Sequence, residues 1–181
     1  MANRLSHIVT RTGDDGSTGL ADGSRISKDD LRVFVIGEID ELNSRIGVLL
    51  AETLPAEVRN DLFQIQNDLF DLGSVLALPG HPFAQGKVSR LDAAIEHYNT
   101  GLPPLREFIL PGGVKAAALC HLVRTQTRCA ERNFVALIQR DDLPSDCLRY
   151  LNRLSDLLFI LSRVINVAAN QPERQWQRAE K

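Results

Sequence analysis

The sequence has no excess of charge of one sign. Its 181 residues include 21 basic and 23 acidic ones, for a net charge of −2. This balance argues against a protein whose main partner is nucleic acid. The sequence also lacks a long apolar run, since the longest uninterrupted aliphatic or aromatic stretch, residues 157–161, is far shorter than the roughly 20 residues of a membrane span. Residues 1–7 have no apolar core, so neither a secretory signal nor a membrane partner is expected.

Paired cysteines and clustered histidines are also missing. The three cysteines, Cys120, Cys129 and Cys147, form no CxxC pair. Structural disulfides and a cysteine zinc site are therefore not expected, and the reducing cytoplasm is the predicted compartment. The four histidines are scattered, and no HExxH motif is present. We therefore expect no protein-bound catalytic metal, and the absence of a G-x-S-x-G motif removes the common serine-hydrolase signature.

What the sequence does contain is helical periodicity. At 44% hydrophobic residues, the chain is long enough to bury one core. Apolar residues recur at the helical period from about residue 30 to a stop at Pro55, and over about 56–77, 87–99, 114–140 and 145–170. Proline or glycine separates these segments. The pattern predicts a single all-α domain over residues 1–181, with an antiparallel five-helix bundle at 30–170.

The two ends of the chain differ from this bundle. Residues 1–29 are rich in glycine and show neither helical nor strand periodicity, so they are predicted to be a loop, with an extended piece near Ile8 and Val9. The tail at 171–181 is polar and is expected to fray after Pro172, with Trp176 the side chain that can dock.

The N-terminal loop is the first candidate site. Residues 10–19 read TRTGDDGSTG. Glycines allow close approach of a ligand to the backbone, and hydroxyls with free N–H groups suit phosphate oxygens. The segment is neither a Walker A loop nor an EF-hand. From composition alone, a phosphate-binding loop and an ordinary surface loop both remain open.

The fourth helical segment carries the second candidate, which we call the arginine stripe: Arg124, Arg128 and Arg132. Their i, i+4, i+8 spacing places them on one face, with Glu131 beside them. Three guanidinium groups on one face need carboxylates from another helix or a polyphosphate. The alternative is a solvated face. Asp40 or Glu41 of the first helix can supply a carboxylate.

Asn152 and Asp156 share a face of the leucine-rich fifth helix, either at its rim or in a buried polar network.

Together these segments resemble the PduO-type ATP:cob(I)alamin adenosyltransferases. Six pieces occur in the family's order between about residues 5 and 168. They are TRTGD at 10–14 with Gly16 and Thr18, KDD at 28–30, GEIDELN at 37–43, FILPGG at 108–113, the arginine stripe with Thr125, Ala130 and Glu131, and NRLSD at 152–156.

The resemblance implies a trimer of five-helix bundles with active sites between subunits. It implies that cobalt(I) attacks the 5′-carbon of ATP and releases triphosphate, so that no catalytic Ser, Cys or His is needed. Magnesium would be carried on ATP. A reductase and an adenosylcobalamin-dependent acceptor enzyme are the further partners implied.

The resemblance also implies residue roles. The ATP contacts in the loop would be Thr10, Arg11, Thr12, Gly13, Thr18 and Lys28. The arginine stripe, Glu131 and Asn152 of the adjacent subunit would complete the site. Asp40 would pair with Arg124, and Phe108 would face the corrin, with Arg128 contacting the triphosphate.

Two positions depart from the family's common pattern. Cys129 stands where many members have a second arginine, and Asp15 where many have lysine. Each removes a positive charge near the expected triphosphate. The alternative function is therefore a non-catalytic ATP-binding helical scaffold, or a degenerate family member.

Overall fold

The computed structural model describes residues 9–78 and 80–178. Its helices are α1 (Leu31–Leu50), α2 (Ala56–Ala77), α3 (Lys87–Thr100), α4 (Lys115–Ile138) and α5 (Ser145–Ala168). The predicted five-helix bundle is confirmed, with helix bounds within two residues of those expected from periodicity, except that α1 ends at Leu50 and not directly before Pro55.

Local chemistry accounts for where the helices begin. The Asp30 carboxylate caps α1 by accepting a hydrogen bond of 2.7 Å from the Arg32 backbone N–H. Pro55 and Pro144 stand directly before α2 and α5. Gly86 precedes α3 with φ of 89°, a left-handed conformation that favours glycine.

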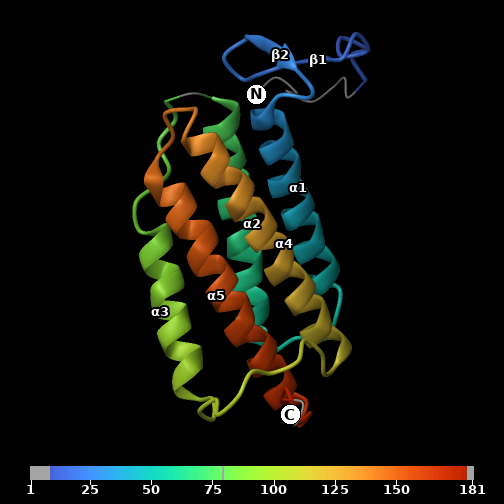
Figure 1. The fold of residues 1–181 in the computed structure, drawn as a ribbon, viewed down its shortest axis with the longest axis vertical. Helices are drawn as coiled ribbons and strands as arrows, with labels where there is room; N and C mark the ends of the chain where they lie inside the picture. The colour runs from blue at the N-terminus through green and yellow to red at the C-terminus, as the bar shows by residue number, and fades with distance from the viewer. Residues whose placement is uncertain (1–8, 79, 179–181) are drawn as a thin grey trace.

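Helix α1 packs against α2 and α4, and α5 packs against α4 and α3, while in the view of Figure 1 α2 lies behind α4 and α5, so the five helices form a bundle. The core runs along the interior of the bundle and consists mainly of leucine, isoleucine and valine. Among its fully buried members are Leu42 of α1, Phe134 of α4 and Leu154 of α5. No helix in the described ranges is both long enough and apolar enough to cross a membrane.

The N-terminal segment differs from the prediction of a plain loop, because it contains a hairpin. Strands β1 (Ser17–Gly19) and β2 (Arg25–Ser27) pair antiparallel, with Thr18 opposite Ile26. The Leu20 N–H donates to the Ser24 carbonyl at 2.8 Å, and Gly23 has φ of 87°. Of the two residues expected to form an extended piece, Val9 belongs to no strand, and Ile8 lies outside the described residues.

The C-terminal tail is also more ordered than expected. The Trp176 N–H donates to the Phe108 carbonyl at 2.7 Å, and the Leu110 N–H donates to the Arg174 carbonyl at 2.8 Å. Ile109 and Gln175 form an antiparallel bridge between them. The expectation that the tail frays after Pro172 is therefore wrong for residues 173–176, because the FILPGG segment supplies backbone partners that helical periodicity cannot reveal.

The hairpin and residues 108–113, which we call the Phe108 segment, lie at opposite ends of the bundle (Figure 1). The hairpin is tied to the C-terminus of α2 by a hydrogen bond of 2.9 Å from the Ala21 N–H to the Ala77 carbonyl. The Phe108 segment lies where α4 begins and α5 ends. The 20 residues of α1 between these ends span about 30 Å.

Candidate functional site

The N-terminal loop gathers several of the predicted phosphate contacts. The Thr10 and Thr12 hydroxyls lie 3.0 Å apart, and both residues are exposed. The Lys28 ammonium donates to the Gly13 carbonyl at 2.7 Å. A Cβ at Gly13 would lie 3.0 Å from both Lys28 Nζ and the Ser17 carbonyl oxygen, so a side chain here would press against both groups. Hydroxyls, a glycine turn and an ammonium are thus brought to one place.

The two other ATP contacts predicted in the loop are Arg11 and Thr18. Arg11 is exposed and adopts a φ of 57°, which is unusual for a residue with a side chain. Thr18 lies within β1 and is half-buried.

Asp15 is one of the two departures from the family pattern, and its negative charge is offset by partners within the loop. Its Oδ1 accepts from the Ser17 N–H at 2.9 Å and from the Ser17 hydroxyl at 2.8 Å, and it lies 3.7 Å from the Arg25 guanidinium. The Ser17 hydrogen bonds, with a contribution from Arg25, hold the pKa of the Asp15 carboxyl below its usual value. Arg25 also donates to the Thr12 carbonyl. It therefore supplies a cation to this loop.

The arginine stripe on α4 is rich in positive charge. Arg128 and Arg132 are exposed and Arg124 is half-buried. Among the ion pairs found over residues 9–78 and 80–178, none involves a stripe arginine. Burial, with repulsion from Arg128, lowers the pKa of Arg124. An anionic ligand would relieve this repulsion.

Arg124 and Arg128 line a groove of about 350 Å³ between α4 and neighbouring helices. Asp156 and Phe159 of α5 lie on its other side, so Asp156 shares the groove with the arginines. A second residue of this region, His121, was not singled out from the sequence. It is buried, and its Nδ1 accepts from Arg124 Nε at 3.4 Å. A lone histidine on an apolar helix face gives no sign in the sequence that it will contact an arginine of the stripe.

The side chain of Asn152 donates from Nδ2 to Glu131 Oε1 at 3.1 Å, which links α5 to α4. Arg153 donates to Asn152 Oδ1 at 3.0 Å and to Asp92 of α3 at 2.8 Å. The structure thus brings together Asn152 and Glu131, which the resemblance placed in one site. Of the two alternatives given for Asn152, a rim position or a buried polar network, these contacts favour a partly buried network.

Asp40 and Arg124 do not meet within one chain. Asp40 is exposed on α1, and in the part of the chain that the structure describes it forms no ion pair. Instead, Glu38 accepts from Asn133 of α4 at 2.9 Å. Cys129 also faces Glu38, and partial burial together with that carboxylate raises the pKa of its thiol. Cys129 is therefore directed toward α1.

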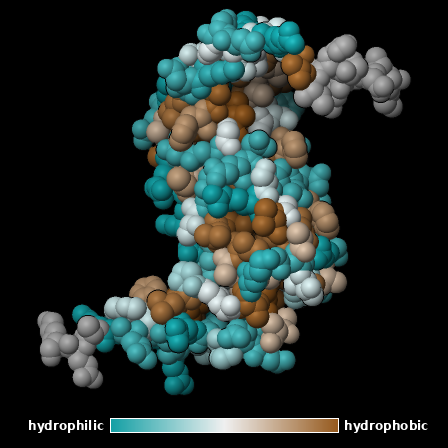
Figure 2. Space-filling view, turned by 90° about the vertical axis from the view of Figure 1, so that its right-hand side faces the viewer, coloured by the Kyte–Doolittle hydropathy of each residue, from teal (hydrophilic) through white to brown (hydrophobic). Residues whose placement is uncertain are grey.

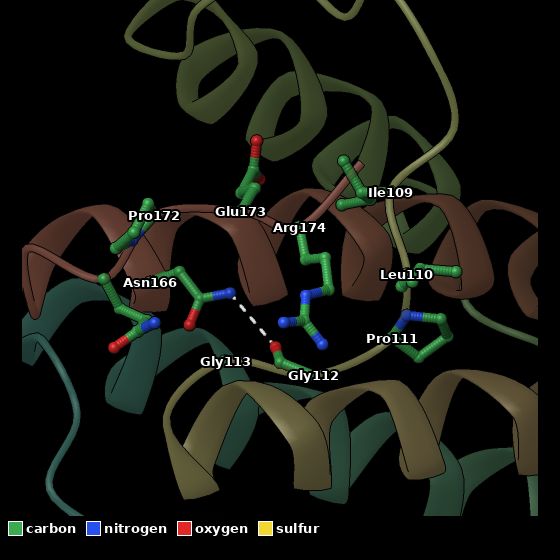
Figure 3. Close-up of a pocket in the computed structure, with 10 residues that line it drawn as sticks. Ile109, Leu110, Pro111, Gly112, Gly113, Asn166, Pro172, Glu173 and Arg174 are labelled. Atoms are coloured by element: carbon green, nitrogen blue, oxygen red, sulfur yellow. Dashed lines mark hydrogen bonds between the residues drawn. The ribbon is translucent and has the colours of Figure 1, made fainter. Parts of the chain in front are cut away.

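Phe108 is 78% exposed, so the structure does not support a role in the core. It begins a segment that borders a cavity of about 650 Å³, lined by residues 109–113 and 171–174 together with Asn166 (Figure 3). Asn166 Nδ2 donates to the Gly112 carbonyl at 3.1 Å, and its Oδ1 accepts from the Val114 N–H at 3.0 Å. At Gly113, with φ of 105°, a Cβ would clash with the Asn166 side chain.

Within the described ranges, no group of three or more His, Cys, Asp or Glu side chains is arranged to hold a metal ion. The polar loop and the arginine stripe offer anion binding, and an exposed aromatic side chain, Phe108, lies at the end of the bundle opposite the loop.

Residues 8–165 match the family described as cobalamin adenosyltransferase, which spans the loop and all but the end of α5. The chain belongs to this family. It is 53% identical over 180 residues to a cobalamin adenosyltransferase of Cupriavidus metallidurans, covering 98% of each chain. It is 43% identical to a corrinoid adenosyltransferase of Bacillus subtilis, covering 95% of this chain and 93% of the relative.

A solved structure from Lactobacillus reuteri has the same fold. It is a variant PduO-type ATP:corrinoid adenosyltransferase complexed with cobalamin and ATP, 35% identical to this chain, with a TM-score of 0.90. The match covers 95% of this chain and 100% of that one. Family membership, the five-helix fold and the resemblance given above are thereby confirmed. The predicted site residues stay predictions.

Proposed function

We propose that this chain transfers the 5′-deoxyadenosyl group of ATP to cob(I)alamin and yields adenosylcobalamin and triphosphate. The electron pair of cobalt(I) forms the bond to C5′, and the C5′–O bond breaks with its electrons leaving on the triphosphate. The chain's family membership supports this reaction. The observation that carries it is the arginine stripe, which has no carboxylate partner among the described residues and so suits a polyanionic leaving group.

The residues of the chain bind and orient ATP. Thr10, Thr12, Gly13, Thr18 and Lys28 contact the nucleotide in the loop, with Arg11 beside them. Arg128 donates to oxygens of the leaving triphosphate, with Arg132 flanking it. The Asn152–Glu131 pair, already formed at 3.1 Å, fixes the adjoining polar contacts. Magnesium is carried on the ATP phosphates, which suits its preference for phosphate oxygens and water.

The active site lies between subunits of a homotrimer. The loop and the Phe108 segment are at opposite ends of the bundle in one chain (Figure 1), whereas reacting atoms must approach to about 3–3.5 Å. If the loop of one subunit lies beside the arginine-lined groove of another, the two regions can come close enough for the reaction. Asp40, exposed and free of ion pairs among the described residues, then pairs with Arg124 of the adjacent subunit.

The surface of α1 and α4 supports such an assembly. Exposed large apolar side chains on these helices are Phe34, Val48, Leu122 and Val135. Figure 2 views the molecule from the right-hand side of Figure 1 and shows apolar areas set among polar ones on that face. Apolar patches rimmed by polar residues are typical of protein–protein contacts.

Phe108 packs beneath the corrin and keeps the lower face of cobalt free of a ligand, which makes reduction to cobalt(I) easier. A reductase that supplies the electron and an acceptor enzyme that takes up adenosylcobalamin are the further partners we propose. The cytoplasm is the proposed compartment, because the three cysteines are all free thiols.

The test is formation of adenosylcobalamin from ATP and cob(I)alamin under reducing conditions, with the parent chain and Phe108→Ala. We expect the parent to form product. Because Phe108 is 78% exposed, the variant should fold and bind ATP normally but convert cobalamin slowly, with the lower ligand still on cobalt(II) in its absorption and electron-spin spectra. A parent that binds ATP without forming product would instead support the non-catalytic scaffold. A variant with the parent's rate would remove Phe108 from the corrin site.

A further inference from the structure

A buried ion pair joins α5 to the C-terminal tail, outside the proposed nucleotide site. Arg163 is 3% exposed, although a charged side chain is rarely buried without a specific partner. Its Nε donates to Glu173 Oε1 at 2.8 Å, and its Nη2 donates to Glu173 Oε2 at 3.2 Å. This two-point geometry fixes the direction of the tail as well as its position.

The same guanidinium holds a third segment. Arg163 Nη2 also donates to the Pro103 carbonyl at 2.8 Å, at the start of the stretch that leads to Phe108. One turn further along α5, Asn166 holds the other end of that stretch through the Gly112 carbonyl and the Val114 N–H. The stretch from 103 to 114 is therefore fastened to α5 at both ends.

Its middle is fastened to the tail. The backbone of residues 108–110 pairs with that of residues 174–176, directly after Glu173. We call residues 171–176 the strap. Figure 3 shows the strap and the Phe108 segment on two sides of the same cavity, with the Arg174 side chain extending toward Gly112. The strap has little apolar anchoring of its own, since Trp176 is 43% exposed.

Arg163 also borders the groove beside the arginine stripe. It lines the groove that contains Arg124 and Arg128, whereas Glu173 lines the cavity beside the Phe108 segment. The pair thus stands between the region assigned to ATP and the region assigned to the corrin.

We propose that Arg163 is a positioning residue for corrinoid binding, acting through Glu173 and the strap to hold the Phe108 segment in place. Arg163 does not touch the reacting atoms. Loss of the pair leaves the bundle folded and the nucleotide site intact, but releases the strap and with it the backbone partner of Phe108. The corrin role of Phe108 rests on the function proposed above, whereas the docking of the strap does not.

The chain offers a direct probe of strap docking. Trp176 is the only tryptophan, so intrinsic fluorescence excited at tryptophan wavelengths reports on the strap alone. The test variant is Glu173→Gln, which keeps the size of the side chain and removes its charge. The matched control is Asp146→Asn, which breaks an exposed ion pair with Arg149 at the other end of the same helix.

For Glu173→Gln we expect red-shifted Trp176 emission and stronger quenching by acrylamide, while circular dichroism stays helical. We also expect KM for cobalamin to rise about tenfold, as misplacement of a positioning group by about 1 Å can cost more than this, with KM for ATP unchanged. Arg163→Lys, which keeps one charge but loses the two-point geometry, should give an intermediate value of each quantity. Asp146→Asn should match the parent in Trp176 emission, in quenching and in both KM values.

Three results would overturn the proposal. The first is unchanged Trp176 emission and quenching in Glu173→Gln. The second is an equal rise in both KM values, which would indicate general disturbance of the site. The third is an unfolded Glu173→Gln chain, which would make the pair a support of the bundle. A parent chain with no adenosylation activity would end the function proposed above, but the fluorescence comparison would still decide whether the pair docks the strap.

Discussion

At the residue scale, the side chains closest to the proposed chemistry are exposed, whereas those that orient them are buried. Arg128 is exposed, but His121 and Arg163 are each 3% exposed. The exposed residues gave a sequence signal through their spacing. The buried ones did not, because a histidine on an apolar face is usually a core residue, and no pattern tells which carboxylate will meet Arg163. Tertiary packing decides both.

Arg128→Ala should lower kcat/KM for ATP by at least about tenfold, because it removes a charge-assisted hydrogen bond of about 1.5–3 kcal/mol to the leaving triphosphate and 1.36 kcal/mol is a factor of ten. Stability should be unchanged, since Arg128 is exposed. Steady-state kinetics at limiting ATP measure this effect. Arg149→Ala, at an exposed arginine of α5, is the control and should keep the parent's kinetics. Full activity of Arg128→Ala would exclude it from the site.

The second residue-scale prediction concerns acid stability. Burial, followed by the nearby Arg124 charge, lowers the pKa of His121 to about 4, against a small opposing effect of Glu173. The unfolded chain, with a histidine pKa near 6.5, therefore binds this proton more readily than the folded one. The stability of the folded chain falls as pH decreases from about 6.5 toward about 4. Between pH 7.5 and pH 5 the His121 contribution to this loss is about 2 kcal/mol.

Urea unfolding of His121→Gln at pH 7.5 and pH 5 measures that contribution. The variant should lose about 2 kcal/mol less than the parent over this interval, because glutamine does not titrate. His81→Gln, at an exposed histidine, is the control and should lose as much as the parent. If His121→Gln and the parent lost the same free energy of unfolding, the claim that His121 is buried as a neutral imidazole would be wrong.

At the element scale, helix positions were predictable and short strands were not. Pro55 and Pro144 stand at helix starts, and the apolar period of each helix is long enough to read from the sequence. Strands β1 and β2 have three residues each, too few for an alternation of apolar and polar residues to be recognised in the sequence. The Asp22–Gly23 pair was the available sign of a hairpin, since this dipeptide favours tight turns.

A buried charged cluster joins three of the helices away from the proposed site. Asp68 of α2 is fully buried and accepts from Lys87 Nζ of α3 at 2.7 Å and from the Tyr150 hydroxyl of α5 at 2.8 Å. Arg90 also donates to it. Since Lys87 is itself nearly buried, its charge depends on this carboxylate.

Asp68→Asn should therefore lower the free energy of unfolding by about 3 kcal/mol or more, because it leaves a buried ammonium without its main partner. Urea denaturation measures this change. Asp71→Asn removes the other carboxylate that contacts Lys87, but Asp71 is 60% exposed, so its effect should stay within about 1 kcal/mol. Similar effects for the two variants would show that burial of Asp68 does not set the cost.

At the scale of the whole molecule, the separation of the two site regions is the main finding. The N-terminal loop is at one end of a bundle about 30 Å long and the Phe108 segment is at the other (Figure 1). The sequence indicated both regions but not their separation, which depends on helix length and direction. From this separation we propose a site shared between subunits, and this proposal is the central claim for this protein.

Subunit complementation tests that claim most directly. Lys28→Ala disables the loop and Arg128→Ala disables the stripe, so each variant alone should form little adenosylcobalamin. In randomly mixed trimers, about one quarter of the sites combine an intact loop from one subunit with an intact stripe from its neighbour. We therefore predict recovery of about one quarter of the parent's rate above the two variants' own activities. Mixed trimers verified by mass spectrometry that recover no activity would place the loop and the stripe of each site on the same chain and contradict the account.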